Sequence, residues 1–156
     1  MPNIKSTIEI AAPRDLVWNL AQDVTKFPDI MPDLDEVKVL AQSEQPDGAR
    51  HVTSEWRGRI QKFNRKMSWT EEDIWDANAH TCRFWQIKGD FDEYRGEWAF
   101  VESGNSTRLD LDLEYRFDIP LVGALMQKVV KGLIQENADN MLKALKAESE
   151  RRAANS

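Results

Sequence analysis

The sequence contains a single cysteine, Cys82, among its 156 residues. A lone cysteine excludes an internal disulfide and is typical of proteins from a reducing compartment. The sequence also lacks any run of 18 apolar residues, so we expect no membrane-spanning helix. Its first residues, Met1 to Lys5, do not form the apolar stretch of a signal peptide. These absences together predict a cytoplasmic protein.

Basic residues are scarce as well. Lysine and arginine number 21 against 27 aspartates and glutamates, which gives a formal net charge of −6. A nucleic-acid groove needs concentrated positive charge, so we expect no nucleic-acid partner. His80 and Cys82 could meet on one strand, but two ligands do not make a metal site. Because phosphate-binding loops and nucleophile motifs are also missing, we expect neither a metal nor an organic cofactor.

Aromatic residues and alternating strands are what the sequence has in quantity. It holds six tryptophans, each of which can bury about 150–250 Å². Alternation of apolar and polar residues predicts six or seven antiparallel strands. The segments are 3–10, 37–42, 50–57, 60–75, 81–88, 94–101 and 108–117. Gly58 suggests a bulge or a break at the end of the third segment.

Helical spacing occurs in three places. A helix beginning near Pro13 follows the first strand, and a short helical turn is expected around Phe27. A long helix is predicted over 121–152, about 45 Å in length at 1.5 Å per residue. Its apolar stripe is Leu125, Val129, Leu133, Asn137, Met141 and Leu145, flanked by Val122, Val130, Ile134 and Leu142. Residues 1–150 are predicted to form one domain, and 151–156 a frayed tail.

This order of elements predicts an α+β fold with a pocket. The curved sheet must bury one face, and only the long helix is large enough to cover it. One helix about 10 Å wide cannot fill the concave side of such a sheet. The remaining space is closed by large side chains, by the short helices, or is left as a cavity. Gly123 and Gly132 would let sheet residues or a ligand approach the long helix closely, although tight helix–sheet packing is the alternative.

Specific segments carry a family resemblance. The run Ile8 to Pro13, the pair Val17-Trp18 and the run Asp23 to Pro32 resemble the opening of the polyketide cyclase/dehydrase and coenzyme Q-binding START-like proteins. The segment from Phe84 to Phe91, leading to Gly96-Glu97-Trp98, resembles their aromatase/cyclase members. The resemblance covers nearly the whole chain. It implies the helix-grip fold shared with START domains and birch-pollen-type allergens.

The resemblance also implies a range of activities. Relatives bind sterols, quinones, polyketides, hormones or lipids under the long helix, and some cyclise polyketides. One bacterial branch is described as interfering with ribosome assembly. Fold alone does not choose among these functions.

Three residues are candidates for catalysis: Arg65, Gln86 and Tyr94. Arg65 is predicted to share a face with Met67 and Trp69, and the resemblance implies an arginine on this strand that polarises a substrate carbonyl. Lys66 could occupy that place instead. The alternative for Arg65 is a surface residue paired with a carboxylate, Glu71 or Asp73. Gln86 could bond a ligand carbonyl or hydroxyl, or simply a neighbouring side chain or water.

The predicted ligand-binding residues combine apolar walls with a few polar tips, as small-molecule pockets do. They are Trp56, Met67, Trp69, Phe84, Trp98, Phe100, Leu111, Tyr115, Val129, Leu133 and Asn137. The alternative is that the aromatic members form a solid core, and that Asn137 makes a local polar contact. The acidic run Glu71-Glu72-Asp73 is interpreted as a solvated strand end, so no buried carboxylate pair is expected.

The leading hypothesis is therefore the binding, transport or presentation of a small hydrophobic ligand such as a polyketide, quinone or lipid. One alternative is a polyketide cyclase or aromatase in which Arg65, Tyr94 or Gln86 orients carbonyl groups. A further alternative is a START-like regulator that binds a ribosome or another protein. The sequence leaves the oligomeric state open.

Overall fold

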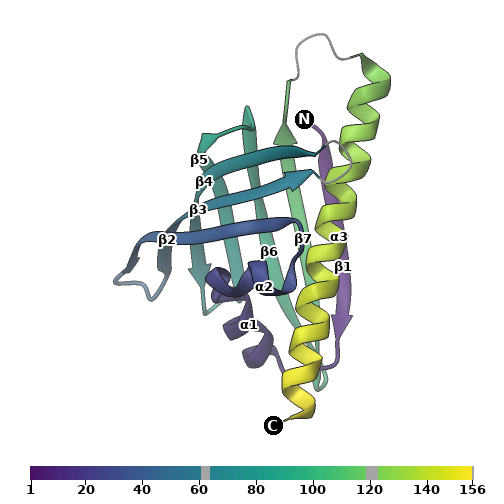
Figure 1. Ribbon diagram of the computed structural model, residues 1–156. Coiled ribbons are helices and arrows are strands. Elements are labelled where there is room, and N and C mark those ends of the chain that lie inside the picture. Colours follow the sequence, from purple (N-terminus) through teal and green to yellow (C-terminus); the bar gives the residue numbers. More distant parts are fainter. Residues whose placement is uncertain (61–63, 119–122, 156) are drawn as a thin grey trace.

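A computed structural model describes residues 1–60, 64–118 and 123–155. One antiparallel sheet of seven strands, in the order β1-β7-β6-β5-β4-β3-β2, curves around a long C-terminal helix (Figure 1). The elements are β1 (Asn3–Ile10), α1 (Arg14–Gln22), η1 (Val24–Lys26), α2 (Phe27–Ile30), β2 (Leu34–Glu44), β3 (Arg50–Ile60), β4 (Arg65–Asp76), β5 (Thr81–Gly89), β6 (Glu93–Ser103), β7 (Ser106–Arg116) and α3 (Ala124–Ala154). The predicted α+β class, with short helices after the first strand, is confirmed.

The concave face of the sheet is apolar because the alternation seen in the sequence is kept along each strand. On β7, Leu109, Leu111, Leu113 and Tyr115 are all buried. At Gly58 the third strand does not break but continues to Ile60. The irregularity lies opposite, in β2, where the pairing register shifts just after Leu34. A Cβ on Gly58 would lie 2.7 Å from the Asp33 carbonyl oxygen, so glycine lets the chain before β2 lie directly on β3.

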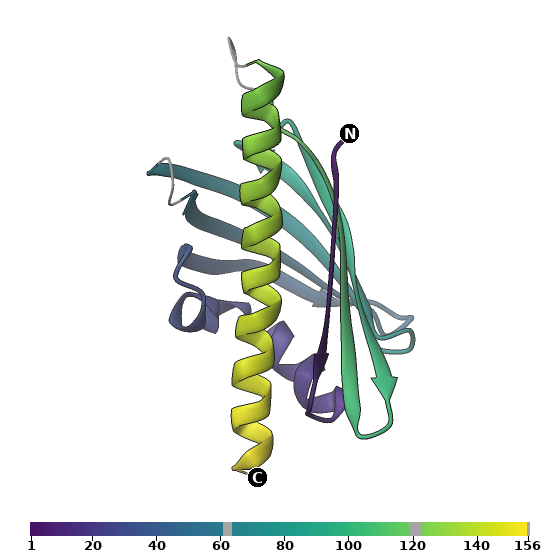
Figure 2. The ribbon, with the colours of Figure 1, turned by 90° about the vertical axis from the view of Figure 1, so that its right-hand side faces the viewer.

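Helix α3 runs along the concave side (Figure 2), but with a face other than the predicted one. Its buried residues are Val130, Ile134, Ala138, Leu142, Leu145 and Ser149. Leu125, the first residue of the predicted stripe, is 78% exposed. A strict four-residue spacing drifts around a helix of 3.6 residues per turn. The three-residue step from Leu142 to Leu145 corrects this drift and keeps the buried face on the sheet.

Polar contacts attach α3 along its length to β1 and to the residue that follows β1. Four hydrogen bonds make this attachment: Ser6 Oγ to Asp139 Oδ1 (2.6 Å), Gln135 Nε2 to the Lys5 carbonyl (3.0 Å), Lys146 Nζ to the Glu9 carbonyl (2.8 Å) and Ala11 N to Glu150 Oε2 (2.8 Å). The edge strand β1 therefore serves as the anchor of the helix.

Neither glycine of the C-terminal region mediates the close approach that was expected. A Cβ added at Gly123 or Gly132 would meet nothing within 4 Å, because both residues lie on the exposed side of the chain. The predicted tail is helical as far as Ala154. There Arg151 and Arg152 both pair with Glu148, and their hydrogen bonds lower the pKa of that carboxyl group to about 2.

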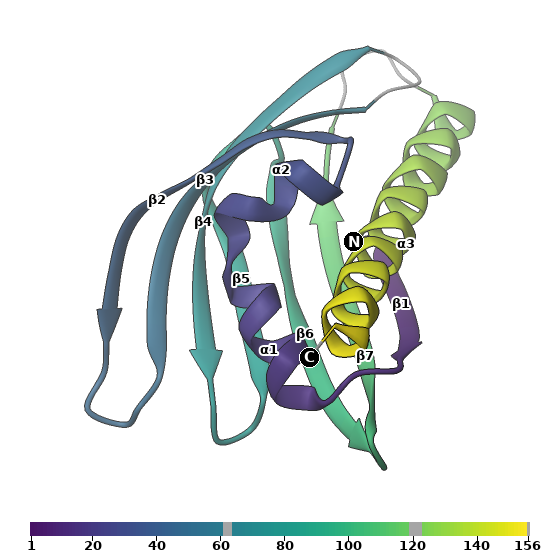
Figure 3. The same cartoon turned by 60° about the horizontal axis from the view of Figure 1, so that its bottom comes forward.

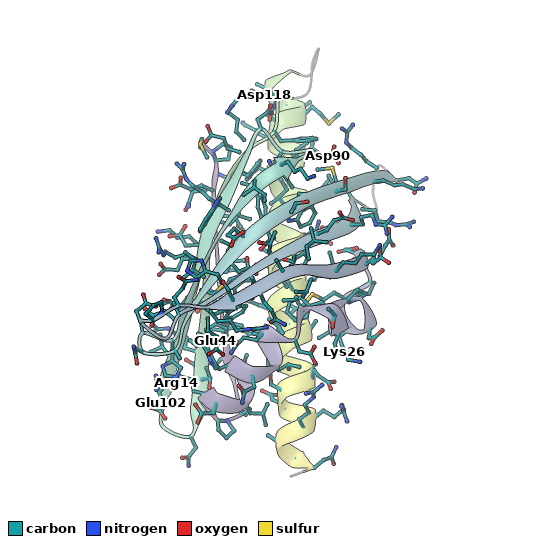
Figure 4. The ribbon with its side chains drawn as sticks, turned by 90° about the vertical axis from the view of Figure 1, so that its left-hand side faces the viewer. Arg14, Lys26, Glu44, Asp90, Glu102 and Asp118 are labelled. Carbon is teal, nitrogen blue, oxygen red and sulfur yellow. The ribbon has the colours of Figure 1, made fainter. Side chains whose placement is uncertain are left out.

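The short helices close one end of the concave side, as Figure 3 shows. Trp18 of α1 packs edge-on against Trp75 and Phe100, with ring centroids 5.4 and 5.1 Å apart. Arg14 lies beside Glu102 at this end of the molecule (Figure 4), 3.6 Å away. Within the described ranges, every helix is too short or too polar to cross a membrane. The cytoplasmic location stays a prediction.

Candidate functional site

A cavity of about 150 Å³ lies between the concave face of the sheet and α3. A dry cavity of roughly this size accommodates benzene, so the interior is not filled by side chains. The predicted ligand-binding residues that line it are Trp56, Met67, Trp69, Phe84, Trp98, Leu111 and Asn137. They come from β3, β4, β5, β6, β7 and α3, which shows that the cavity belongs to the whole sheet rather than to one hairpin.

Stacked aromatic rings form one wall of the cavity. Trp56 and Trp69 are parallel within 8°, with centroids 5.9 Å apart. Tyr94 continues the wall, because its ring lies 5.7 Å from Trp69 and 5.6 Å from Phe84. Phe91 stacks on Tyr94 at 4.7 Å. Such a wall suits a flat, apolar ligand, since aromatic rings favour offset-stacked and edge-on contacts.

Four predicted ligand-binding residues lie away from the cavity lining. Phe100 packs against Trp18 and Trp75 in the closed end of the molecule. Tyr115 is 1% exposed, and its hydroxyl is enclosed without a hydrogen-bond partner in the described ranges. Val129 and Leu133 are only partly buried, on the first half of α3. The rotation of the helix described above explains the placement of these last two.

Among the predicted catalytic residues, Tyr94 alone lines the cavity. Arg65 is exposed, with its guanidinium 5.2 Å above the ring of Phe117, and Lys66 beside it is exposed too. The ion pair considered for Arg65, with Glu71 or Asp73, does not form between these described residues. A role for Arg65 in polarising a carbonyl stays a prediction.

Gln86 repairs a gap in the sheet. Strands β5 and β6 pair only as far as Trp85 and Arg95. Beyond that point the Gln86 Nε2 donates to the Phe91 carbonyl (2.8 Å), and the Phe91 N–H donates to Gln86 Oε1 (3.3 Å). Both ends of the amide are thus engaged with backbone, and Gln86 borders a hollow on the outer face of the sheet instead of the cavity.

The acidic run on β4 is the site feature that the sequence interpretation placed wrongly. Glu71 and Asp73 are 6% and 3% exposed and line the cavity, so this part of the strand is not a solvated end. The Trp69 indole N–H donates to Glu71 Oε1 (2.8 Å). Only Glu72 lies on the outer face, where it accepts a hydrogen bond from Thr53 Oγ1 (2.6 Å). The strand is buried here because α3 and the aromatic wall cover it.

The two buried carboxyl groups are in hydrogen-bond contact with each other. Burial raises the pKa of Glu71, and burial together with the neighbouring Glu71 carboxylate raises the pKa of Asp73 well above its ordinary value, against a weaker opposing effect of Arg50. Burial also raises the pKa of Cys82 and of Tyr94 nearby. We conclude that the pair holds a proton at neutral pH, carried by Asp73 and donated to Glu71.

The site therefore combines a flat aromatic wall with one enclosed polar spot that can exchange hydrogen bonds and protons. In the described part of the chain, no three His, Cys, Asp or Glu side chains gather in a way that could hold a metal ion.

Comparison with known proteins gives consistent matches. Residues 10–142 match the family described as polyketide cyclase/dehydrase and lipid transport. The crystal structure of TTHA0849 from Thermus thermophilus is 32% identical, with a TM-score of 0.86 over 99% of this chain and 100% of that one. The Zhui aromatase/cyclase from Streptomyces sp. R1128 is 21% identical, with a TM-score of 0.83 over 97% and 94%. A putative polyketide cyclase from Streptomyces cyaneus is 25% identical over 129 residues, covering 81% of this chain and 82% of that protein.

Proposed function

Because the chain belongs to the polyketide cyclase/dehydrase and lipid transport family, and because its sheet and α3 enclose a cavity, we propose that the protein binds a small hydrophobic molecule there. One observation carries the proposal: a void of about 150 Å³ bordered by the parallel rings of Trp56 and Trp69. An apolar guest would replace empty space by contacts with these rings, which stabilises the complex through burial and dispersion.

The size of the cavity favours a particular kind of guest. A void of this volume takes one aromatic ring, whereas whole-ligand pockets are commonly about 300–1,000 Å³. Two lining residues, Pro32 after α2 and Asn140 on α3, are exposed, so the cavity reaches the surface beside them. A ligand with a flat head group inside and a longer chain directed outward fits this shape. Quinones, aromatic polyketides and phenolic lipids all have that form.

The proposal is tested by titrating the protein with a naphthoquinone and following tryptophan fluorescence. We expect saturable quenching, because Trp56, Trp69 and Trp98 border the cavity. Trp98→Ala should weaken binding by removing part of the wall. Trp85→Ala is the matched control, because Trp85 lies on the same sheet but borders the outer hollow. Linear, non-saturable quenching by every apolar ligand class would rule the proposal out.

Cyclisation of a polyketide is the second candidate function, and the buried acid pair is the observation that favours it. Ring closure needs a group that takes a proton from a carbon beside a carbonyl and a donor near the carbonyl oxygen. Glu71, Asp73 and Tyr94 border the cavity and include both kinds of group. Incubation with a synthetic poly-β-ketone thioester should then give a product mixture that changes in Tyr94→Phe. An unchanged mixture, identical to that formed without protein, would exclude this activity.

A further inference from the structure

The polar groups of the cavity are concentrated at one place in an otherwise apolar lining. Asp73 is 97% buried from solvent, as its 3% exposure shows. Its Oδ1 atom is fully enclosed and receives no hydrogen bond from an N–H or O–H of the described residues. The carboxyl group nevertheless borders the void. A buried polar atom without a partner is costly and uncommon in folded proteins, so this oxygen requires an explanation.

The arrangement of protons determines which ligand group could supply the missing partner. Glu71 accepts a hydrogen bond from the Trp69 indole (2.8 Å) and is in contact with Asp73. When the pair holds one proton between its two carboxyl groups, that proton is used inside the pair. What remains toward the cavity is an oxygen acceptor on Asp73, and an acceptor binds a donor such as a hydroxyl. A ligand carbonyl oxygen would face a second acceptor.

The charge of the pair acts in the same direction. A pair with one proton keeps one negative charge, and the nearby cations are engaged elsewhere. Arg50 donates to Gln22 and Gln42, and Arg59 is paired with Asp35. A ligand carboxylate would therefore bring a second negative charge into an enclosed, poorly solvated space, where like charges repel strongly.

We propose that the Glu71–Asp73 pair is the binding site for a ligand hydroxyl, so that the cavity selects neutral, phenol-like molecules over hydroxyl-free analogues and over carboxylates. This inference deepens the proposed function and rests on it. The aromatic wall binds the ring, and the acid pair orients it by accepting the hydroxyl hydrogen.

Three probes of one shape test the selection: p-cresol, toluene and 4-methylbenzoate, each with one ring and one methyl group. Binding is measured by isothermal titration calorimetry. In a purely apolar cavity toluene would bind best, because an unpartnered hydroxyl loses its hydrogen bonds to water. We expect the opposite order, with p-cresol binding about tenfold more tightly than toluene, as a hydrogen bond to a charged pair allows. Binding of 4-methylbenzoate should be weaker than that of p-cresol by at least about tenfold.

Two variants of Asp73 separate the hydrogen bond from other effects. Asp73→Leu removes the acceptor and should reverse the order, so that toluene binds more tightly than p-cresol. Asp73→Asn should keep the order, because its Nδ2 donates to Glu71 as the protonated acid does and its Oδ1 still accepts. Glu72→Gln is the matched control: it changes the adjacent carboxylate on the outer face and should leave the affinity ratio unaltered.

The outcomes distinguish this inference from the proposed function. Binding of toluene without any advantage for p-cresol in the unmodified protein overturns the hydroxyl site but leaves hydrophobic binding intact. A preference for p-cresol that survives in Asp73→Leu also overturns it. Failure of both neutral probes to bind overturns the hydroxyl site and the proposed function together. The unmodified protein alone decides the first and third outcomes, so the test does not depend on the stability of a variant.

Discussion

Asp73 holds a proton in the folded protein that it gives up in the unfolded chain, and this difference has a measurable effect on stability. In an unfolded chain an aspartate loses its proton near pH 4. In the folded protein, burial and the Glu71 carboxylate raise the pKa of Asp73 well above that value. The folded state therefore binds more protons than the unfolded state in the intervening range. The free energy of unfolding must fall as the pH rises from about 4 through the raised pKa of Asp73.

The size of the effect follows from one proton. A difference of one bound proton changes the free energy of unfolding by about 1.4 kcal/mol per pH unit. Asp73→Asn removes this titration while keeping the shape and the hydrogen bond to Glu71. The variant should match the unmodified protein near pH 4. Above that pH it should become progressively more stable than the unmodified protein, by up to about 1.4 kcal/mol for each pH unit.

Urea unfolding of both proteins between pH 4 and 8 measures the difference. Glu148 and Glu150, whose pKa values are lowered by their basic partners and backbone contacts, destabilise both proteins equally on acidification and cancel in the comparison. Glu72→Gln serves as the control for removal of a nearby charge. Parallel curves for Asp73→Asn and the unmodified protein would refute the account of a buried, proton-holding pair.

Three further substitutions test the packing around the cavity. Gly96→Ala should lower the free energy of unfolding in urea by about 1–3 kcal/mol, because its Cβ would lie 2.6 Å from Phe84 Cζ; an undisturbed protein would show that the ring moves away freely. Gly132→Ala, in open space, should raise the melting temperature through about 1 kcal/mol of helix propensity, and a decrease would mean that the bare backbone is needed. Thr107→Val should cost about 1–3 kcal/mol in the same urea assay, because it leaves the buried Ala12 carbonyl without its 2.9 Å hydrogen bond; full stability would indicate that another donor replaces it.

The fold was predictable because its strands keep a strict period of two and its last helix is long. The opening residues, such as Pro13 and the run ending at Pro32, also identified the family correctly. These features depend on local sequence alone. The helix face depended on packing: the predicted stripe ended in Leu145, which is buried, but began at Leu125, which is not. A single three-residue step decides the difference, and periodicity over a short window does not resolve it.

The acid pair was missed although the sequence held a signal for it. Met67 and Trp69 were assigned to the concave face, and the same alternation, carried two steps further, reaches Glu71, Asp73 and finally Trp75. Three consecutive acidic residues suggested solvent, since charged groups are rarely buried. Alternation was the better guide, because a strand under a helix has one buried face regardless of the residues on it. The engagement of Gln86 with backbone, in contrast, depends on a gap in the sheet that no local pattern reveals.

The one-sided attachment of α3 bears on how a guest larger than a single ring could be admitted. The four hydrogen bonds that fasten the helix all reach β1 or Ala11, whereas Ile134, Met141 and Leu145 border the void with apolar groups. Rotation of the helix about the β1 edge would widen the space above β3 and β4 while these four bonds persist. The work of such swelling is then mainly lost apolar contact, which an incoming hydrocarbon chain restores. Capacity in this architecture is set by the guest as much as by the empty protein.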